Sequence, residues 1–192
     1  MASPAVKTER FTYSDYLTWN GDERWEIIEG IPYSMSPAPN RRHQEFLGII
    51  FNPISNYLKG KKCKVYVAPF DVRFAASFND DYLIESVVQP DISVFCDEKK
   101  LDDRGAKGPP DWIIEILSPA TASKDLHEKL LLYQKYGVKK YWIVNLELET
   151  ISKLVLDKTG KYLPGKEHHK KEIISPEIFP ELVFNLDELF NS

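Results

Sequence analysis

The stretch that decides the fold is Pro109-Pro110-Asp111-Trp112-Ile113-Ile114-Glu115-Ile116-Leu117-Ser118-Pro119. An apolar run bounded by prolines is typical of a buried strand. Glu115 interrupts this run, and a charge inside a core strand is costly to bury unless it is paired or binds a cation. A second apolar run, residues 91–95, begins with another carboxylate, Asp91. We therefore expect the two core strands to bring the carboxylates of Asp91 and Glu115 together, where they can hold one metal ion.

A simpler interpretation of the same two acids stays open. Asp91 then caps a turn, and Glu115 pairs with a lysine in a purely structural ion pair, since such pairs also perturb carboxylates. The residues of these two strands do not by themselves choose between the two interpretations.

Length and composition indicate one globular domain, expected to span residues 1–192. The chain is 43% hydrophobic and 12% aromatic, as in ordinary globular proteins. No stretch approaches the roughly 18 apolar residues of a membrane span, and the first ten residues lack the apolar core of a signal peptide. Cys63 and Cys96, the only cysteines, suit a reducing compartment and argue against a disulfide scaffold. The expected location is cytoplasmic.

Charge and metal-ligand spacing limit the function classes. The net charge is −4, whereas proteins that grip a nucleic acid usually present a basic surface. Positive charge would therefore have to be local, and the candidates are the lysine runs at 59–62, 99–100 and 166–171. A zinc site built from the two cysteines with His168 and His169 is disfavoured, because their spacing has no paired-ligand pattern.

The order of predicted elements favours an α/β (α+β) fold. Apolar residues at steps of three and four predict a helix at 41–58, interrupted by Pro53. A second helix is expected at about 122–136, with Gly137 at its C-cap. The remaining elements are helices at 12–17 and 187–190, a hairpin at 24–29 and 31–35, and strands at 63–67, 70–74, 91–95, 112–117, 141–146, 151–156 and 172–174. Strands mixed with helices in this order predict a mixed central sheet flanked by helices.

One ordered set of short motifs resembles a known family. The set is Arg24-Trp25-Glu26-Ile27-Ile28-Glu29-Gly30, Met35-Ser36-Pro37, His43, Gln89-Pro90-Asp91, Pro110-Asp111, Glu115-Ile116-Leu117-Ser118-Pro119-Ala120-Thr121, Asp125, Lys129, Tyr133, Gly137-Val138 and Tyr141-Trp142-Ile143-Val144. It resembles the restriction endonuclease family, long catalogued as a domain of unknown function, within the PD-(D/E)XK nuclease superfamily. The likeness covers about residues 11–146.

The resemblance implies a restriction-endonuclease-like core over these residues. Beyond it, the strand patterns at 151–156 and 172–174 predict an antiparallel meander with a lysine-rich turn between them, so that residues 147–192 form a C-terminal extension. It implies that Asp91 and Glu115 are the metal-binding and catalytic acids. The superfamily triplet Glu-x-Lys would place a lysine at 117, where this chain has Leu117. Lys129 on the following helix is the matching catalytic lysine, and it shares a helix face with Asp125, four residues earlier.

The chemistry implied is hydrolysis of DNA phosphodiester bonds with Mg²⁺, for which Mn²⁺ is a substitute. Mg²⁺ prefers oxygen ligands and typically takes one or two carboxylates, here Asp91 and Glu115 with the carbonyl of Ile116. Supporting roles are expected for Glu26, which the family pattern favours over Glu29, and for His43. A lone histidine on an apolar face is, however, often only packed.

Three functions remain open from the sequence. The first is a Mg²⁺-dependent endonuclease. The second is a catalytically idle module that binds nucleic acid or protein, which Leu117 and the acidic pI of about 5.6 favour. The third is a hydrolase of smaller phosphate esters. A homodimer is expected, because two-fold proteins match two-fold duplexes and C2 dimers are the commonest oligomers.

Overall fold

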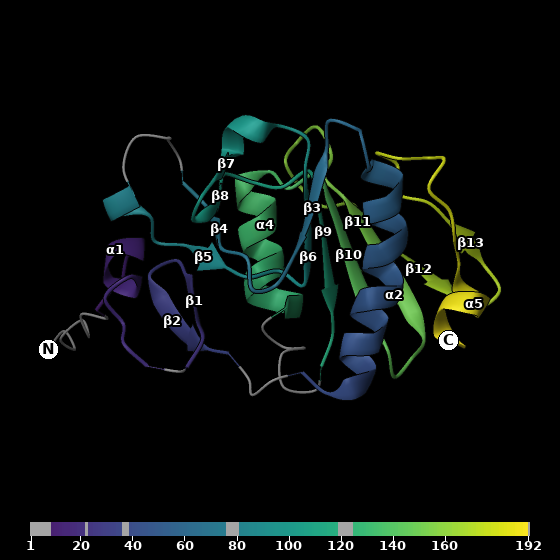
Figure 1. The fold of residues 1–192 in the computed structure, drawn as a ribbon, viewed down its shortest axis with the longest axis horizontal. Coiled ribbons are helices and arrows are strands. Elements are labelled where there is room, and N and C mark those ends of the chain that lie inside the picture. Colours follow the sequence, from purple (N-terminus) through teal and green to yellow (C-terminus); the bar gives the residue numbers. More distant parts are fainter. Residues whose placement is uncertain (1–8, 22, 36–38, 76–80, 119–124, 192) are drawn as a thin grey trace, which may run out of the picture.

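The computed structural model describes residues 9–21, 23–35, 39–75, 81–118 and 125–191 as a mixed α/β fold with two six-stranded sheets (Figure 1). We call them the central sheet, ordered β12-β11-β10-β9-β6-β3, and the second sheet, ordered β2-β1-β5-β4-β8-β7. The predicted fold class is confirmed.

The central sheet is built around the apolar stretch at residues 109–119. Its strands are β3 (Lys64–Val67), β6 (Ile92–Phe95), β9 (Trp112–Ile116), β10 (Lys140–Asn145), β11 (Thr150–Val155) and β12 (Lys166–His169). β9 runs antiparallel to β6 and parallel to β10. All five residues of β9 are buried, which explains why an apolar run rather than an alternating pattern encodes it.

Alternation along β9 divides the core into two layers. Trp112, Ile114 and Ile116 join the apolar cluster that contains the buried side of α2 (Arg41–Leu58) and α5 (Leu186–Phe190). Ile113 instead joins the cluster that contains α4 (Leu130–Tyr136) and residues of the second sheet. Figure 1 shows α2 and α4 on opposite sides of the central sheet. Glu115 has the parity of Ile113 and therefore faces the α4 side.

The second sheet carries the N-terminal hairpin. Its strands are β1 (Trp25–Ile28), β2 (Ile31–Ser34), β4 (Val72–Arg73), β5 (Val87–Val88), β7 (Leu101–Asp102) and β8 (Gly105–Lys107). β1 pairs with β2 and with β5, so the hairpin predicted from the sequence is confirmed. The two short strands β7 and β8 lie in a charged segment for which the sequence pattern indicated no strand.

The helices follow their sequence signals closely. α2 has the predicted bounds, with Asn40 as its N-cap and Pro53 inside it. α1 (Tyr13–Tyr16) begins after the capping residue Thr12. Ahead of α4 lies a π-helical turn, η3 (Asp125–Lys129), and Gly137 ends α4 with a φ of 79°, a conformation that glycine adopts without strain. The predicted start near 122 lies outside the described residues. Two 3-10 turns, η1 (Asp81–Leu83) and η2 (Glu98–Lys100), complete the set.

Two expectations were wrong. Residues 172–174 do not continue the meander after β11, which pairs instead with β12 inside the lysine-rich segment. β13 (Ile173–Ile174) pairs with β14 (Phe184–Asn185) in a separate two-stranded sheet, so the tertiary partner overrode the sequence pattern.

The second error concerns the cysteines. Cys63 and Cys96 form a disulfide, with a Cα–Cα distance of 4.0 Å. Cys63 directly precedes Lys64, and Cys96 directly follows Phe95, its partner in the antiparallel pairing of β3 with β6, so the strand register places the two cysteines opposite each other. A separation of 33 residues in the sequence conceals this.

Within the described part of the chain, no helix combines the length and apolar character needed to span a bilayer.

Candidate active site

Glu115 lies near the end of β9 and is only 2% exposed. Its Oε1 lies 2.9 Å from the Nζ of Lys129 and accepts a hydrogen bond of 2.7 Å from the hydroxyl of Tyr133. Both partners come from the helical segment after β9, on the face that strand parity assigns to Glu115. Lys129, which the sequence placed on the helix after this strand, therefore brings a positive charge directly beside Glu115.

Glu26 on β1 adds a second buried carboxylate. Its side chain has no solvent exposure, and its Oε1 lies 3.0 Å from Lys129 Nζ. The same oxygen accepts a hydrogen bond of 2.9 Å from the backbone N–H of Gln89. Glu29 instead pairs with Lys135 on the surface. The preference for Glu26 over Glu29 therefore has a geometric basis, and the two sheets meet at Lys129.

Asp91 directly precedes β6 and is tied to Glu115 through the backbone. Its N–H donates to Glu115 Oε2 at 3.2 Å, and its Oδ2 accepts from the N–H of Ile116 at 2.8 Å. Antiparallel pairing of β6 with β9 produces this reciprocal contact. The two acids converge at one end of neighbouring strands, as the sequence predicted, and the side chain of Asp91 is 19% exposed.

His43 reaches the same point from the first turn of α2. Its Nε2 lies 3.1 Å from the carbonyl oxygen of Ile116 and 3.3 Å from Asp91 Oδ2. Burial opposes the charged ring, yet the hydrogen bond and charge of Asp91 and the carbonyl of Ile116 raise the pKa of His43 above its ordinary value. Nδ1 is buried without a hydrogen-bond partner among the described residues. His43 thus contacts Asp91 rather than merely filling the core.

Tyr133 is a site residue that sequence reasoning placed in the family set without assigning it a contact. Complete burial, with the nearby charge of Glu115, raises the pKa of its hydroxyl well above 10.0. The hydroxyl therefore keeps its proton and donates to Glu115. Its position one turn after Lys129, at the i,i+4 spacing that brings side chains onto one helix face, was the available signal.

The oxygen atoms near Asp91 suit a hard cation. Asp91 and Glu115 supply carboxylates and Ile116 a carbonyl, which are the ligand types of Mg²⁺. Asp91 Oδ1 accepts no hydrogen bond from the described residues. No group of three or more His, Cys, Asp or Glu side chains in the described ranges is arranged to hold a metal ion. A pair of carboxylates still matches the one or two that Mg²⁺ typically takes with water and phosphate.

The positive surface near the acids differs from the one that the sequence suggested. The lysine run at 59–62 follows the far end of α2, about 24 Å along the axis from His43. Arg41 and Arg42, directly before His43, have side chains that are 85% and 55% exposed. Sequence reasoning missed them because it searched for runs of lysine rather than for basic residues beside a candidate site.

Comparison with known proteins identifies the family to which the chain belongs. A family model described as "Uma2: Putative restriction endonuclease" matches residues 13–187. The chain belongs to the Uma2 family. The match includes Glu26, His43, Asp91, Glu115 and Lys129, whose catalytic and metal-binding roles stay predictions.

Two further proteins resemble this Uma2 chain. A crystal structure titled as a putative nuclease belonging to DUF820, from Anabaena variabilis, superposes with a TM-score of 0.75 at 20% identity, covering 94% of this chain and 98% of that one. At this identity the likeness shows the fold alone. "Uncharacterized protein slr1290" of Synechocystis is 24% identical over 133 residues, covering 68% of this chain. The alignment spans just under two thirds, 66%, of that relative's length.

Proposed function

We propose that this chain is a Mg²⁺-dependent endonuclease that hydrolyses phosphodiester bonds of DNA. The observation that carries the proposal is the position of Lys129 Nζ, 2.9 Å from Glu115. Leu117 stands where the superfamily triplet needs a lysine, and Lys129 supplies that charge from the next helix. Membership of the Uma2 family supports the same reaction class.

The proposed metal ligands are Asp91, Glu115 and the carbonyl oxygen of Ile116, with Mn²⁺ as a substitute for Mg²⁺. Bound there, the ion would lower the pKa of a coordinated water and stabilise the charge that develops on the phosphate. The partial exposure of Asp91 supports an opening through which such a ligand and a substrate arrive.

The chain's own residues would hold the two carboxylates in position and offset the negative charge of the phosphate. Lys129 holds a positive charge beside Glu115, where it offsets the negative charge of an approaching phosphate. Tyr133 keeps Glu115 in position through its hydroxyl proton. His43 fixes Asp91 Oδ2 and the carbonyl of Ile116 with one ring nitrogen. Arg41 and Arg42 would contact the phosphates of the DNA backbone. Their positive charge is local, because the chain as a whole has a net charge of −4.

The alternative is a catalytically idle module that binds nucleic acid or protein. One observation favours it: Lys129 is only 3% exposed and contacts two glutamates, as a structural ion pair would. In that case the cluster stabilises the junction between the two sheets and performs no chemistry.

Cleavage of supercoiled plasmid DNA tests the choice. We expect nicking with Mg²⁺ or Mn²⁺, none with a chelator, and none from Glu115→Gln. Glu167→Gln is the matched control, because Glu167 lies on β12 with a side chain that is 48% exposed. The same assay with RNA of matched sequence shows which nucleic acid is cleaved faster. Absence of metal-dependent cleavage, with both ions tested, would reject the nuclease in favour of the idle module.

We further propose that the chain acts as a homodimer. β12 forms one edge of the central sheet, and large apolar side chains are exposed in the same extension, including Leu148, Ile173 and Val183. An open edge and exposed apolar groups are surfaces through which a second copy can associate. Light scattering at micromolar concentration should return twice the chain mass, and a single chain mass would reject the dimer.

A further inference from the structure

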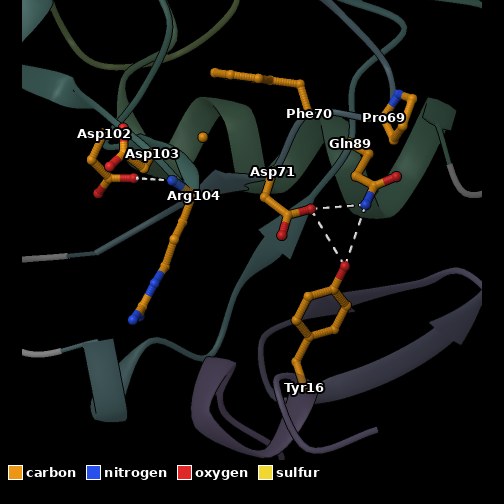
Figure 2. Close-up of a pocket in the computed structure, with 9 residues that line it drawn as sticks. Tyr16, Pro69, Phe70, Asp71, Gln89, Asp102, Asp103 and Arg104 are labelled. Carbon is orange, nitrogen blue, oxygen red and sulfur yellow. Dashed lines mark hydrogen bonds between the residues drawn. The ribbon is translucent and has the colours of Figure 1, made fainter. Parts of the chain in front are cut away.

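A cavity of about 380 Å³ opens on the second-sheet side of the molecule, lined by residues from α1, β7, β8 and the segments beside β4 and β5 (Figure 2). Its volume lies at the small end of the range of ligand sites, about 300–1,000 Å³. The candidate active site already described does not use its polar groups. The polar side chains of the lining that could contact a ligand are those of Tyr16, Asp71, Gln89 and Arg104.

The back of the cavity is a fixed polar network. Gln89 is only 7% exposed. Its Nε2 donates to Asp71 Oδ1 at 2.8 Å and lies 3.3 Å from the hydroxyl of Tyr16, and its Oε1 accepts from Arg24. The backbone carbonyl of Asp71 is held by the N–H of Ala106 at 2.8 Å. Gln89 therefore has no amide group to spare, and it locks Asp71 in one orientation.

One acceptor in this network is left over. The second carboxylate oxygen of Asp71 accepts no hydrogen bond from the described residues, and Figure 2 shows it turned away from Gln89, toward the space between Tyr16 and Arg104. Burial raises the pKa of Asp71, while hydrogen bonds from Gln89 and Tyr16 oppose that shift. A half-buried carboxylate with one open oxygen is stabilised by a ligand that brings an N–H donor.

The walls define the shape and charge of that ligand. Pro69 and Phe70 present apolar surface on one side, and a tyrosine ring and a guanidinium are groups on which planar bases stack. Asp103 adds a second carboxylate to that of Asp71 in the lining, and this negative charge disfavours a phosphate inside the cavity. A planar, uncharged ring with an exocyclic amino group meets all of these conditions.

Backbone hydrogen bonds connect the cavity directly to the candidate active site. The backbone N–H of Gln89 donates to the oxygen of Glu26 that also contacts Lys129. The N–H of Ala68, next to the cavity wall, donates to the backbone carbonyl of Asp91 at 3.2 Å. Gln89 and Asp91 are two residues apart, so their Cα atoms are separated by at most about 7 Å. A nucleotide bound at the acids can thus place a neighbouring base in the cavity.

We propose that this cavity is a base-binding subsite that holds one unstacked nucleobase carrying an exocyclic amino group, as cytosine and adenine do and thymine does not. The placement of that base next to the cleaved bond rests on the proposed nuclease function; the binding of the base does not. An acidic carboxylate that accepts from the cytosine amino group is an established type of base contact.

Binding without metal tests the subsite separately from cleavage. Fluorescence anisotropy with chelator present compares labelled single-stranded oligodeoxycytidylate, oligodeoxyadenylate and oligothymidylate of equal length. We expect the first two to bind about tenfold more tightly than the third, as for one hydrogen bond to a charged group. Oligodeoxycytidylate with dimethylated amino groups should bind as weakly as oligothymidylate, a comparison that needs no protein variant.

Variants then locate the effect. Asp71→Asn should bring the affinities for the cytidylate and the thymidylate within about twofold of each other, whereas Asp187→Asn on α5 should keep the wild-type difference. Tyr16→Phe should show a smaller loss than Asp71→Asn, and Tyr57→Phe on α2 should show none. Each variant is first shown to melt cooperatively like the wild type.

The outcomes separate the two proposals. Equal binding of all three oligonucleotides by the wild type would overturn the subsite, whether or not the chain cleaves DNA. Discrimination that survives in Asp71→Asn would also overturn it. Discrimination by a wild-type chain that never cleaves with Mg²⁺ or Mn²⁺ would support the subsite and reject the nuclease.

Discussion

Lys129 and Arg73 are both buried cations that contact two carboxylates, yet their surroundings differ. Lys129 lies between two glutamates that are themselves buried. Arg73 has no exposed surface, but its partners Asp81 and Asp102 have side chains that are 29% and 47% exposed. Water therefore shares the solvation of the carboxylates around Arg73 and is largely excluded from those around Lys129.

The balance of charge differs as well. Asp81 also contacts Lys107 at 2.8 Å and lies 3.7 Å from Arg104, so cations match or exceed the acids around Arg73. Around Lys129, two buried glutamates contact the same lysine, and Asp91 lies directly against Glu115. A buried excess of negative charge is costly unless another cation binds. The Arg73 cluster therefore has the composition of a structural ion-pair network, and the Lys129 cluster is the place where we propose that a metal ion binds.

The largest expected effect is on cleavage by Glu115→Gln. Removing this charge should lower the cleavage rate by at least about a thousandfold, since both a metal ligand and the partner of Lys129 are lost. The melting temperature should stay equal or rise, because the repulsion between Glu115 and the neighbouring carboxylates of Glu26 and Asp91 is removed. Plasmid cleavage and thermal melting measure the two effects. A large fall in melting temperature would mean that this cluster, too, is mainly structural.

Lys129→Met should lower the cleavage rate by about a hundredfold or more, while the protein still binds Mn²⁺. Without metal, two buried carboxylates lose their cation, a change that typically costs about 3–5 kcal/mol of stability. Added Mn²⁺ should restore part of that loss, as seen in thermal melts. Lys135→Met, on the same helical segment but 56% exposed, is the control. Full cleavage activity in Lys129→Met would contradict the role of the lysine.

Arg73→Met tests the other cluster. We expect a loss of about 1.5–3 kcal/mol in the free energy of unfolding by urea, because the hydrogen bonds that the buried guanidinium makes to partly solvated carboxylates are lost. Added Mn²⁺ should restore none of it, in contrast to Lys129→Met. Arg10→Met, which breaks an exposed ion pair, should change stability by less than about 1 kcal/mol. Recovery of Arg73→Met by metal would erase the distinction between the clusters.

The smallest effect is the pH dependence of the Arg73 cluster. Burial alone would raise the pKa of Asp102, but hydrogen bonds from Arg73 and from the N–H of Arg104 lower it below 3.8. A lowered folded-state pKa means that the stabilisation is fully present above pH 3.8 and is lost as the pH falls through the lower folded value. The melting-temperature difference between wild type and Asp102→Asn should therefore be constant from pH 7 to 5 and shrink below 3.8. A difference that grows in acid would contradict the pairing.

Local pattern was enough for much of this molecule. The apolar period of α2, its cap at Asn40 and the stop at Gly137 are signals within a few residues, so their elements could be predicted. The buried runs that became β6 and β9 carried Asp91 and Glu115, and a charge in a core strand is conspicuous in any sequence. The resemblance of the motifs to a nuclease family added Lys129.

Tertiary structure alone decided which groups meet. Whether Glu26 or Glu29 faces Lys129, and whether Gln89 joins Glu26 to the cavity, depends on how the second sheet packs against α4. The partner of β11 and the pairing of Cys63 with Cys96 depend on strand register. These contacts join residues distant in the chain, and local propensity carries no information about them, because their free energy arises only when both sheets have packed and water has left the space between them.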